Sequence, residues 1–91
     1  MKPTFLELRH LRTLLALKET GSVSMAAKRV YLTQSALSHQ IKLMEEQFGL
    51  PLFERKSNPL RFTTAGDRLI RLANEILPKV VDAERELARV K

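Results

Sequence analysis

Polar side chains between Thr33 and Gly49 have the types and the spacing needed to read the edges of nucleic-acid bases. Thr33 is expected to cap a helix that Gly49 ends. Apolar residues at i, i+4, i+7 and i+11 predict its buried face, namely Leu37, Ile41, Met44 and Phe48. The opposite face carries amide, hydroxyl and imidazole groups and no carboxylate, which is typical of a base-reading surface. We expect base contacts from Gln34, Ser35, Ser38 and His39.

These side chains give little support for catalysis. Ser35, Ser38 and His39 have no acidic residue nearby to orient the imidazole, and a helix face offers no oxyanion hole. The chain has no cysteine, and His10 and His39 are far apart in sequence, so a metal site is not expected. There is also no glycine-rich phosphate loop. We therefore expect a protein that is not an enzyme and has no cofactor.

The positive charge of the chain is concentrated in two segments. Residues 20–44 and 55–66 each hold three basic residues and no acidic one, so together they account for the net charge of +6. This distribution is typical of a protein that binds a polyanion, although a basic, solvated surface is an open alternative. Hydroxyls, helix N-termini and cations in this region are candidates for phosphate contacts. The predicted phosphate and wing contacts are Ser22, Ser24, Thr33, Lys42, Arg55, Lys56 and Arg61.

Two further helices are predicted before the segment from Thr33 to Gly49. Residues 4–7 fit a capping box that would start a first helix, and Gly21 would end it. Ser22 can cap a short second helix over residues 23–30, followed by a tight turn at residues 31–32. Two helices joined in this way can place the second one in the major groove of DNA.

A hairpin and a long helix are predicted after the segment from Thr33 to Gly49. Residues 52–55 and 60–63 read as short strands joined by a polar, basic turn, which is the pattern of a wing. Thr63 or Thr64 would cap a last helix that reaches the C-terminus, and we expect Pro78 to bend this helix without breaking it. Apolar residues recur along it at heptad spacing and predict a dimerisation seam. The seam residues are Leu69, Ala73, Ile76, Val80, Ala83, Leu87 and Val90.

The predicted fold is therefore mainly α-helical. Residues 1–64 would form a winged helix-turn-helix of three helices and a two-stranded wing, and residues 65–91 a linker helix for dimerisation. A chain of 91 residues allows one small core. No apolar run approaches the roughly 18 residues of a membrane span, and the N-terminus does not resemble a secretory signal, so we expect a soluble, cytoplasmic protein.

Over essentially its whole length the sequence resembles the N-terminal DNA-binding domain of LysR-type bacterial transcriptional regulators. Five motifs carry the resemblance, at residues 8–12, 21–27, 33–41, 52–55 and 60–66. Within the family, residues 34–40 and 55–63 are most similar to the members that regulate methionine biosynthesis.

The resemblance implies a homodimer that forms through antiparallel linker helices. It also implies that this dimer binds double-stranded DNA at an interrupted inverted repeat. It maps the base-reading positions onto Gln34, Ser35, Ser38 and His39, and the wing arginine onto Arg55. Many relatives carry proline at the position of Ser35 and arginine at that of His39. Family members continue into an effector-binding domain, and the full-length protein can be a tetramer. We therefore expect that this chain does not itself sense a small-molecule effector.

Two other functions fit the sequence. The chain could be a coiled-coil dimerisation module whose basic charge gives non-specific affinity for nucleic acids. It could also bind RNA or an anionic membrane through its basic face. One tyrosine, four phenylalanines and no tryptophan make a stacking platform for single strands a poor fit.

Overall fold

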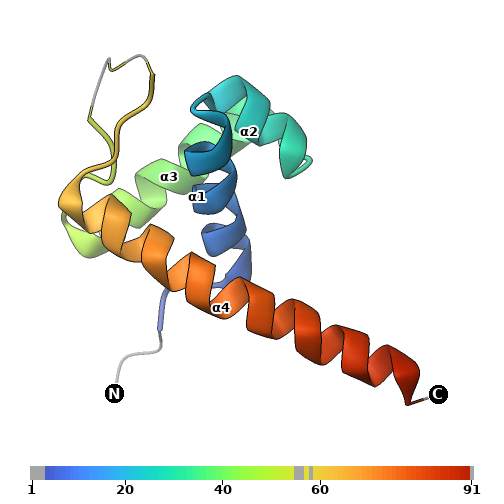
Figure 1. The fold of residues 1–91 in the computed structure, drawn as a ribbon. Helices are drawn as coiled ribbons and strands as arrows, with labels where there is room; N and C mark the ends of the chain where they lie inside the picture. The colour runs from blue at the N-terminus through green and yellow to red at the C-terminus, as the bar shows by residue number, and fades with distance from the viewer. Residues whose placement is uncertain (1–3, 55–56, 58, 91) are drawn as a thin grey trace.

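The computed structural model describes residues 4–54, 57 and 59–90, and within them the chain forms four helices (Figure 1). Their bounds are Leu8–Thr20 for α1, Val23–Arg29 for α2, Gln34–Phe48 for α3 and Thr64–Arg89 for α4. α1 contacts both α2 and α4, while α3 contacts α2. The C-terminal half of α4 extends away from the other three helices (Figure 1). No helix in the described ranges is long and apolar enough to cross a membrane.

Local capping interactions fix most of the helix ends where the sequence predicts them. Ser22, Thr33 and Thr63 each accept a hydrogen bond from the backbone N–H three residues further on, at 3.0 to 3.2 Å. Gly21 and Gly49 end α1 and α3 with φ values of 68° and 66°. This left-handed conformation carries no steric cost for glycine. The predicted limits of α3 are therefore confirmed.

The start of α1 differs from the prediction. The expected capping box at residues 4–7 is wrong, because α1 begins at Leu8 with Glu7 as its N-cap. The backbone N–H of Glu7 donates to Nδ1 of His10 at 2.9 Å. The His10 imidazole therefore accepts the bond to the N-cap backbone that the predicted capping box assigned to the side chain of Glu7. Phe5 stacks on the His10 ring, with centroids 4.9 Å apart. This packing holds Phe5 outside the helix.

Apolar packing places the buried face of α3 against α1. Leu17 of α1 and Leu37 of α3 belong to one core cluster, and Leu14 and Met44 belong to a second cluster that reaches α4 through Ile70. All four of the α1 and α3 side chains are fully buried. In the rest of the predicted inner face, Ile41 is half-buried and Phe48 is 39% exposed, with its ring meeting the edge of the Phe5 ring.

The predicted hairpin is present in a shorter form. We use the name wing for residues 52–63. One antiparallel bridge joins Phe53 to Phe62, in place of two strands over 52–55 and 60–63. Two backbone hydrogen bonds flank this bridge: the N–H of Glu54 donates to the Arg61 carbonyl and the N–H of Thr63 donates to the Leu52 carbonyl, both at 3.0 Å. The two bridged rings lie 4.7 Å apart, and Nζ of Lys18 lies 5.6 Å from the centre of the Phe62 ring. Residues 55, 56 and 58 lie outside the described part of the chain.

α4 is one continuous helix that includes Pro78, which confirms that the proline does not break it; the bend at Pro78 stays a prediction. Ala73, which the heptad pattern assigns to a dimer seam, is fully buried against the chain's own core. Its burial leaves no free surface on that side chain. Near the C-terminus, in contrast, Leu87 is 69% exposed and Val90 is 80% exposed. The first half of α4 therefore covers the core, whereas every residue from 81 to 89 is exposed.

His10 is a buried titratable residue in the first turn of α1. The residue is 3% exposed, and its Nδ1 acts as a hydrogen-bond acceptor, which requires an unprotonated nitrogen. Burial lowers the pKa of His10 below its ordinary value of 6.5, the charge of Arg9 lowers it further, and Glu7 opposes the shift. The folded chain therefore favours the neutral imidazole.

We expect the free energy of unfolding to fall as the pH drops below 6.5, because the unfolded chain then binds a proton at His10 that the folded chain resists. Urea unfolding between pH 7.5 and pH 5 measures this loss. His10→Gln should remove much of the pH dependence, whereas His39→Gln, at an exposed position, should retain it. An identical pH dependence in the two variants would contradict the assignment to His10.

Candidate nucleic-acid interface

The turn between α2 and α3 sets the direction in which α3 leaves the core. Tyr31 has a φ of 59°, a conformation that is uncommon for a residue with a side chain. The N–H of Leu32 donates to the Ala27 carbonyl at 2.9 Å, which closes the turn three residues after the end of α2. Leu32 packs against the core and Tyr31 is 95% exposed. α2 and α3 thus form a helix-turn-helix pair.

All four predicted base-reading residues lie on the first two turns of α3. Gln34, Ser35, Ser38 and His39 are exposed. None of their side chains has a hydrogen-bond or salt-bridge partner within the described residues. Gln34 and Ser38 are four residues apart, as are Ser35 and His39, so they form two adjacent rows along the helix. The structure brings these polar groups together on one accessible surface.

The charge of α3 changes sign along its length. Its first nine residues, 34–42, contain Lys42 and no acidic residue, whereas Glu45 and Glu46 follow in the last turn and a half. Glu46 is exposed and lies seven residues after His39, on the same side of the helix. The absence of carboxylates from the outer face therefore holds for the first half of α3 and does not extend to its C-terminal end.

Five of the predicted phosphate contacts lie within the described residues. Ser24, Thr33, Lys42 and Arg61 are exposed, and Ser22 is half-buried. The oxygens of Ser22 and Thr33 accept the capping bonds described above, which leaves their hydroxyl hydrogens free to donate. The two remaining predictions, Arg55 and Lys56, lie outside the described residues.

The base of the wing is tied to α4 through the backbone around Leu52. The Leu52 carbonyl accepts the N–H of Thr63 at 3.0 Å, and the Thr63 hydroxyl donates to the Pro51 carbonyl at 2.7 Å. A Cβ atom on Gly66 would lie 2.3 Å from the Leu52 oxygen, so only glycine allows α4 to approach this closely. The start of α4 and the start of the wing therefore form one packed unit.

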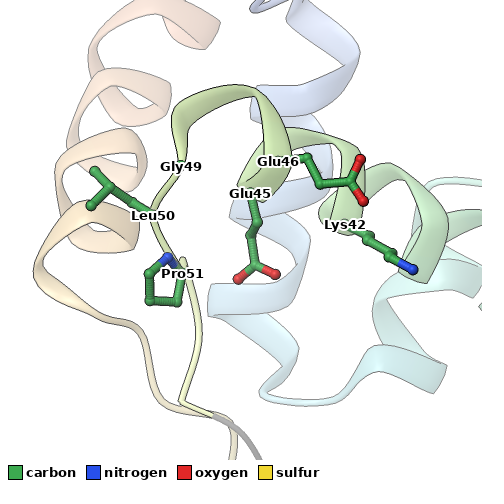
Figure 2. A pocket seen from close by; sticks show the side chains of 6 residues that line it. All are labelled: Lys42, Glu45, Glu46, Gly49, Leu50 and Pro51. Carbon is green, nitrogen blue, oxygen red and sulfur yellow. The ribbon is translucent and has the colours of Figure 1, made fainter.

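A pocket of about 340 Å³ lies at the C-terminal end of α3 (Figure 2). Its lining residues are Lys42, Glu45, Glu46, Gly49, Leu50 and Pro51. Glu45 lies on its wall and bonds the backbone of the wing, a role that the sequence analysis did not predict. The signal in the sequence was weak: an acidic residue directly follows the buried Met44, near the inner face of the helix.

No group of three or more potential metal ligands occurs in the part of the chain that the structure describes.

Residues 8–67 match the family model described as "Bacterial regulatory helix-turn-helix protein, lysR family". The HTH-type transcriptional regulator MetR of Haemophilus influenzae is 89% identical over 91 residues, which is all of this chain and 29% of that protein. MetR of Escherichia coli K12 is 50% identical over 78 residues, covering 86% of this chain and 25% of that protein. The chain thus spans less than a third of the length of these curated relatives.

Solved structures share the same fold. The BenM DNA-binding domain in complex with benA site 1 DNA is 35% identical, with a TM-score of 0.84 and coverage of 93% of this chain and 96% of that one. The CbnR DNA-binding domain in complex with DNA is 29% identical, with a TM-score of 0.77 and coverage of 94% and 100%. The winged helix-turn-helix fold predicted from the sequence is therefore confirmed. With the family match spanning both helices of the helix-turn-helix and the base of the wing, the chain belongs to the LysR family of bacterial regulatory helix-turn-helix proteins.

Proposed function

We propose that the chain binds double-stranded DNA in a sequence-specific manner, as the DNA-binding part of a bacterial transcriptional regulator. The observation that carries this proposal is the exposed first half of α3, where amide, hydroxyl and imidazole groups have no partner within the described chain and no carboxylate lies among them. The BenM and CbnR domains that share the fold are described as complexes with DNA, which supports the same partner here.

The side chains suit the two kinds of contact that specific binding requires. In the major groove Gln34 can make a bidentate pair with adenine, and the Ser38 hydroxyl can donate to or accept from several bases. Lys42, Arg61 and the hydroxyl of Thr33 would hold the phosphates and so fix the register of α3 on the duplex. Ser35 and His39 stand where many relatives carry proline and arginine, so we expect a base preference that differs from theirs.

The second half of α4 suggests how two chains would combine. With 26 residues the helix is about 39 Å long, and its apolar face is exposed toward the C-terminus. In an antiparallel pair of these helices, Val80 would face its own copy near the two-fold axis. We propose a homodimer of this kind, which would present two α3 helices to the halves of an interrupted inverted repeat.

The similarity to MetR leads us to propose a role for the full-length protein. At 89% identity over 91 residues, the chain would bind operators of the kind that MetR recognises and regulate methionine biosynthesis genes. It would act in the cytoplasm, at the bacterial chromosome. Response to a small-molecule effector, and any assembly into tetramers, would depend on the part of the relatives that extends beyond this chain.

Gln34→Ala and Ser38→Ala should each cost about 1–3 kcal/mol in binding to the preferred duplex and much less on duplexes altered at the base they contact. The preferred duplex would be selected from a random pool. Fluorescence anisotropy titrations with this duplex and its single-base variants measure the loss of binding free energy. Lys42→Ala serves as the control, because loss of a phosphate contact should weaken all duplexes alike and reduce the salt dependence by about one unit of slope. If Gln34→Ala and Ser38→Ala weaken every duplex equally, α3 does not read bases.

Leu87→Asp should convert the dimer to a monomer in sedimentation equilibrium, because it places a charge in the apolar face of α4. Val81→Asp is the matched control: Val81 is also exposed on α4, at 42%, but points to a different side of the helix from the seam. A dimer that withstands Leu87→Asp, or one that Val81→Asp dissociates to the same extent, would contradict the proposed interface.

A further inference from the structure

Glu45 makes a direct bond between α3 and the backbone of the wing. Its Oε2 accepts the N–H of Leu52 at 2.7 Å, in a partly buried contact across seven residues. Figure 2 shows the Glu45 side chain directed toward the segment at Pro51, on the wall of the cavity. The α3 helix ends at Gly49, so the carboxylate bridges the loop that leads from this helix into the wing.

The peptide groups of Leu52 are fixed from two sides. The carbonyl accepts the N–H of Thr63, the last residue of the wing and the N-cap of α4, while the N–H donates to the Glu45 carboxylate. Leu52 is 1% exposed, so water has little access to this backbone. A buried N–H that loses its partner destabilises the conformation that buries it. Glu45 is therefore the group that holds the entry of the wing against α3.

The adjacent acidic residue has a different environment. Glu46 is exposed, and Figure 2 shows it next to Lys42 and turned away from the loop. No hydrogen bond or salt bridge involves the Glu46 side chain within the described residues. The two carboxylates thus carry the same charge at neighbouring positions, but only one of them contacts the wing.

We propose that Glu45 is a positioning residue for DNA binding: its carboxylate fixes the wing relative to α3, so that wing cations such as Arg61 reach the phosphates while α3 occupies the groove. This inference rests on the proposed function. Glu45 itself would repel a nearby phosphate, so a purely electrostatic view and the positioning role predict opposite effects when the carboxylate is removed.

The test compares Glu45→Ala with Glu46→Ala, each of which removes one negative charge from the same turn of α3. Glu45→Ala should weaken binding to the selected duplex about tenfold and reduce the salt dependence to that of Arg61→Ala, because the wing no longer holds its phosphate contacts. Glu46→Ala should bind as tightly as the unmodified chain, or more tightly. Glu45→Gln should restore binding, since its amide oxygen can still accept the N–H of Leu52.

Amide hydrogen exchange on the free chain tests the anchor without DNA. Exchange at Leu52 should be about tenfold faster in Glu45→Ala and unchanged in Glu46→Ala and Glu45→Gln. If Glu45→Ala fails to fold, Glu45→Asp takes its place: it keeps the charge but shortens the side chain, and it should show the same weaker binding and faster exchange. Unchanged exchange at Leu52, or DNA binding as tight as that of Glu46→Ala, would overturn the proposal. If the unmodified chain binds no duplex, the proposed function fails, and the exchange comparison still decides whether Glu45 holds the wing.

Discussion

The burial of Leu37 and Met44 determines which face of α3 is free. Each side chain is fully buried, one in the core cluster with Leu17 and the other in the cluster with Leu14. Rotation of α3 about its axis by one residue would expose them, at a cost of about 1.5–3 kcal/mol for each side chain, and would bury polar groups without partners. The burial of these two side chains in the core thus keeps the amide and hydroxyl groups of α3 on the surface.

The two halves of α3 then serve different purposes. The first half begins at the Thr33 cap and offers uncharged donors and acceptors with one cation, Lys42. The second half carries Glu45 and Glu46, and a carboxylate there can bond the wing without lying among the base-reading residues. An acidic residue in the first half would repel phosphates, whereas in the last turn it can organise the protein. This division would let the proposed base-reading surface and the Glu45 carboxylate occupy one short helix.

Features set by local interactions could be predicted from the sequence. The caps at Ser22 and Thr33 and the stop at Gly49 depend on neighbouring backbone groups, and their side chains or conformations are visible in the sequence itself. Features set by tertiary packing could not. The late start of α1 follows from the stacking of Phe5 on His10, and the intramolecular burial of Ala73 follows from the position of α4 across α1. The bond between Glu45 and the Leu52 backbone leaves only a weak signal in the sequence, because the partner of the carboxylate is a backbone N–H. The base-reading role of α3 stays a prediction, because it depends on contacts with DNA and not on contacts within the chain.

The most direct test of the account is an NMR titration of the chain with its selected duplex, followed by measurement of contacts between protein and DNA protons. We predict contacts from the side chains of Gln34, Ser35, Ser38 and His39 to base protons in the major groove, with backbone shifts concentrated in residues 33–42. A complex in which these residues keep their free-state signals while other surfaces contact the duplex would contradict the account.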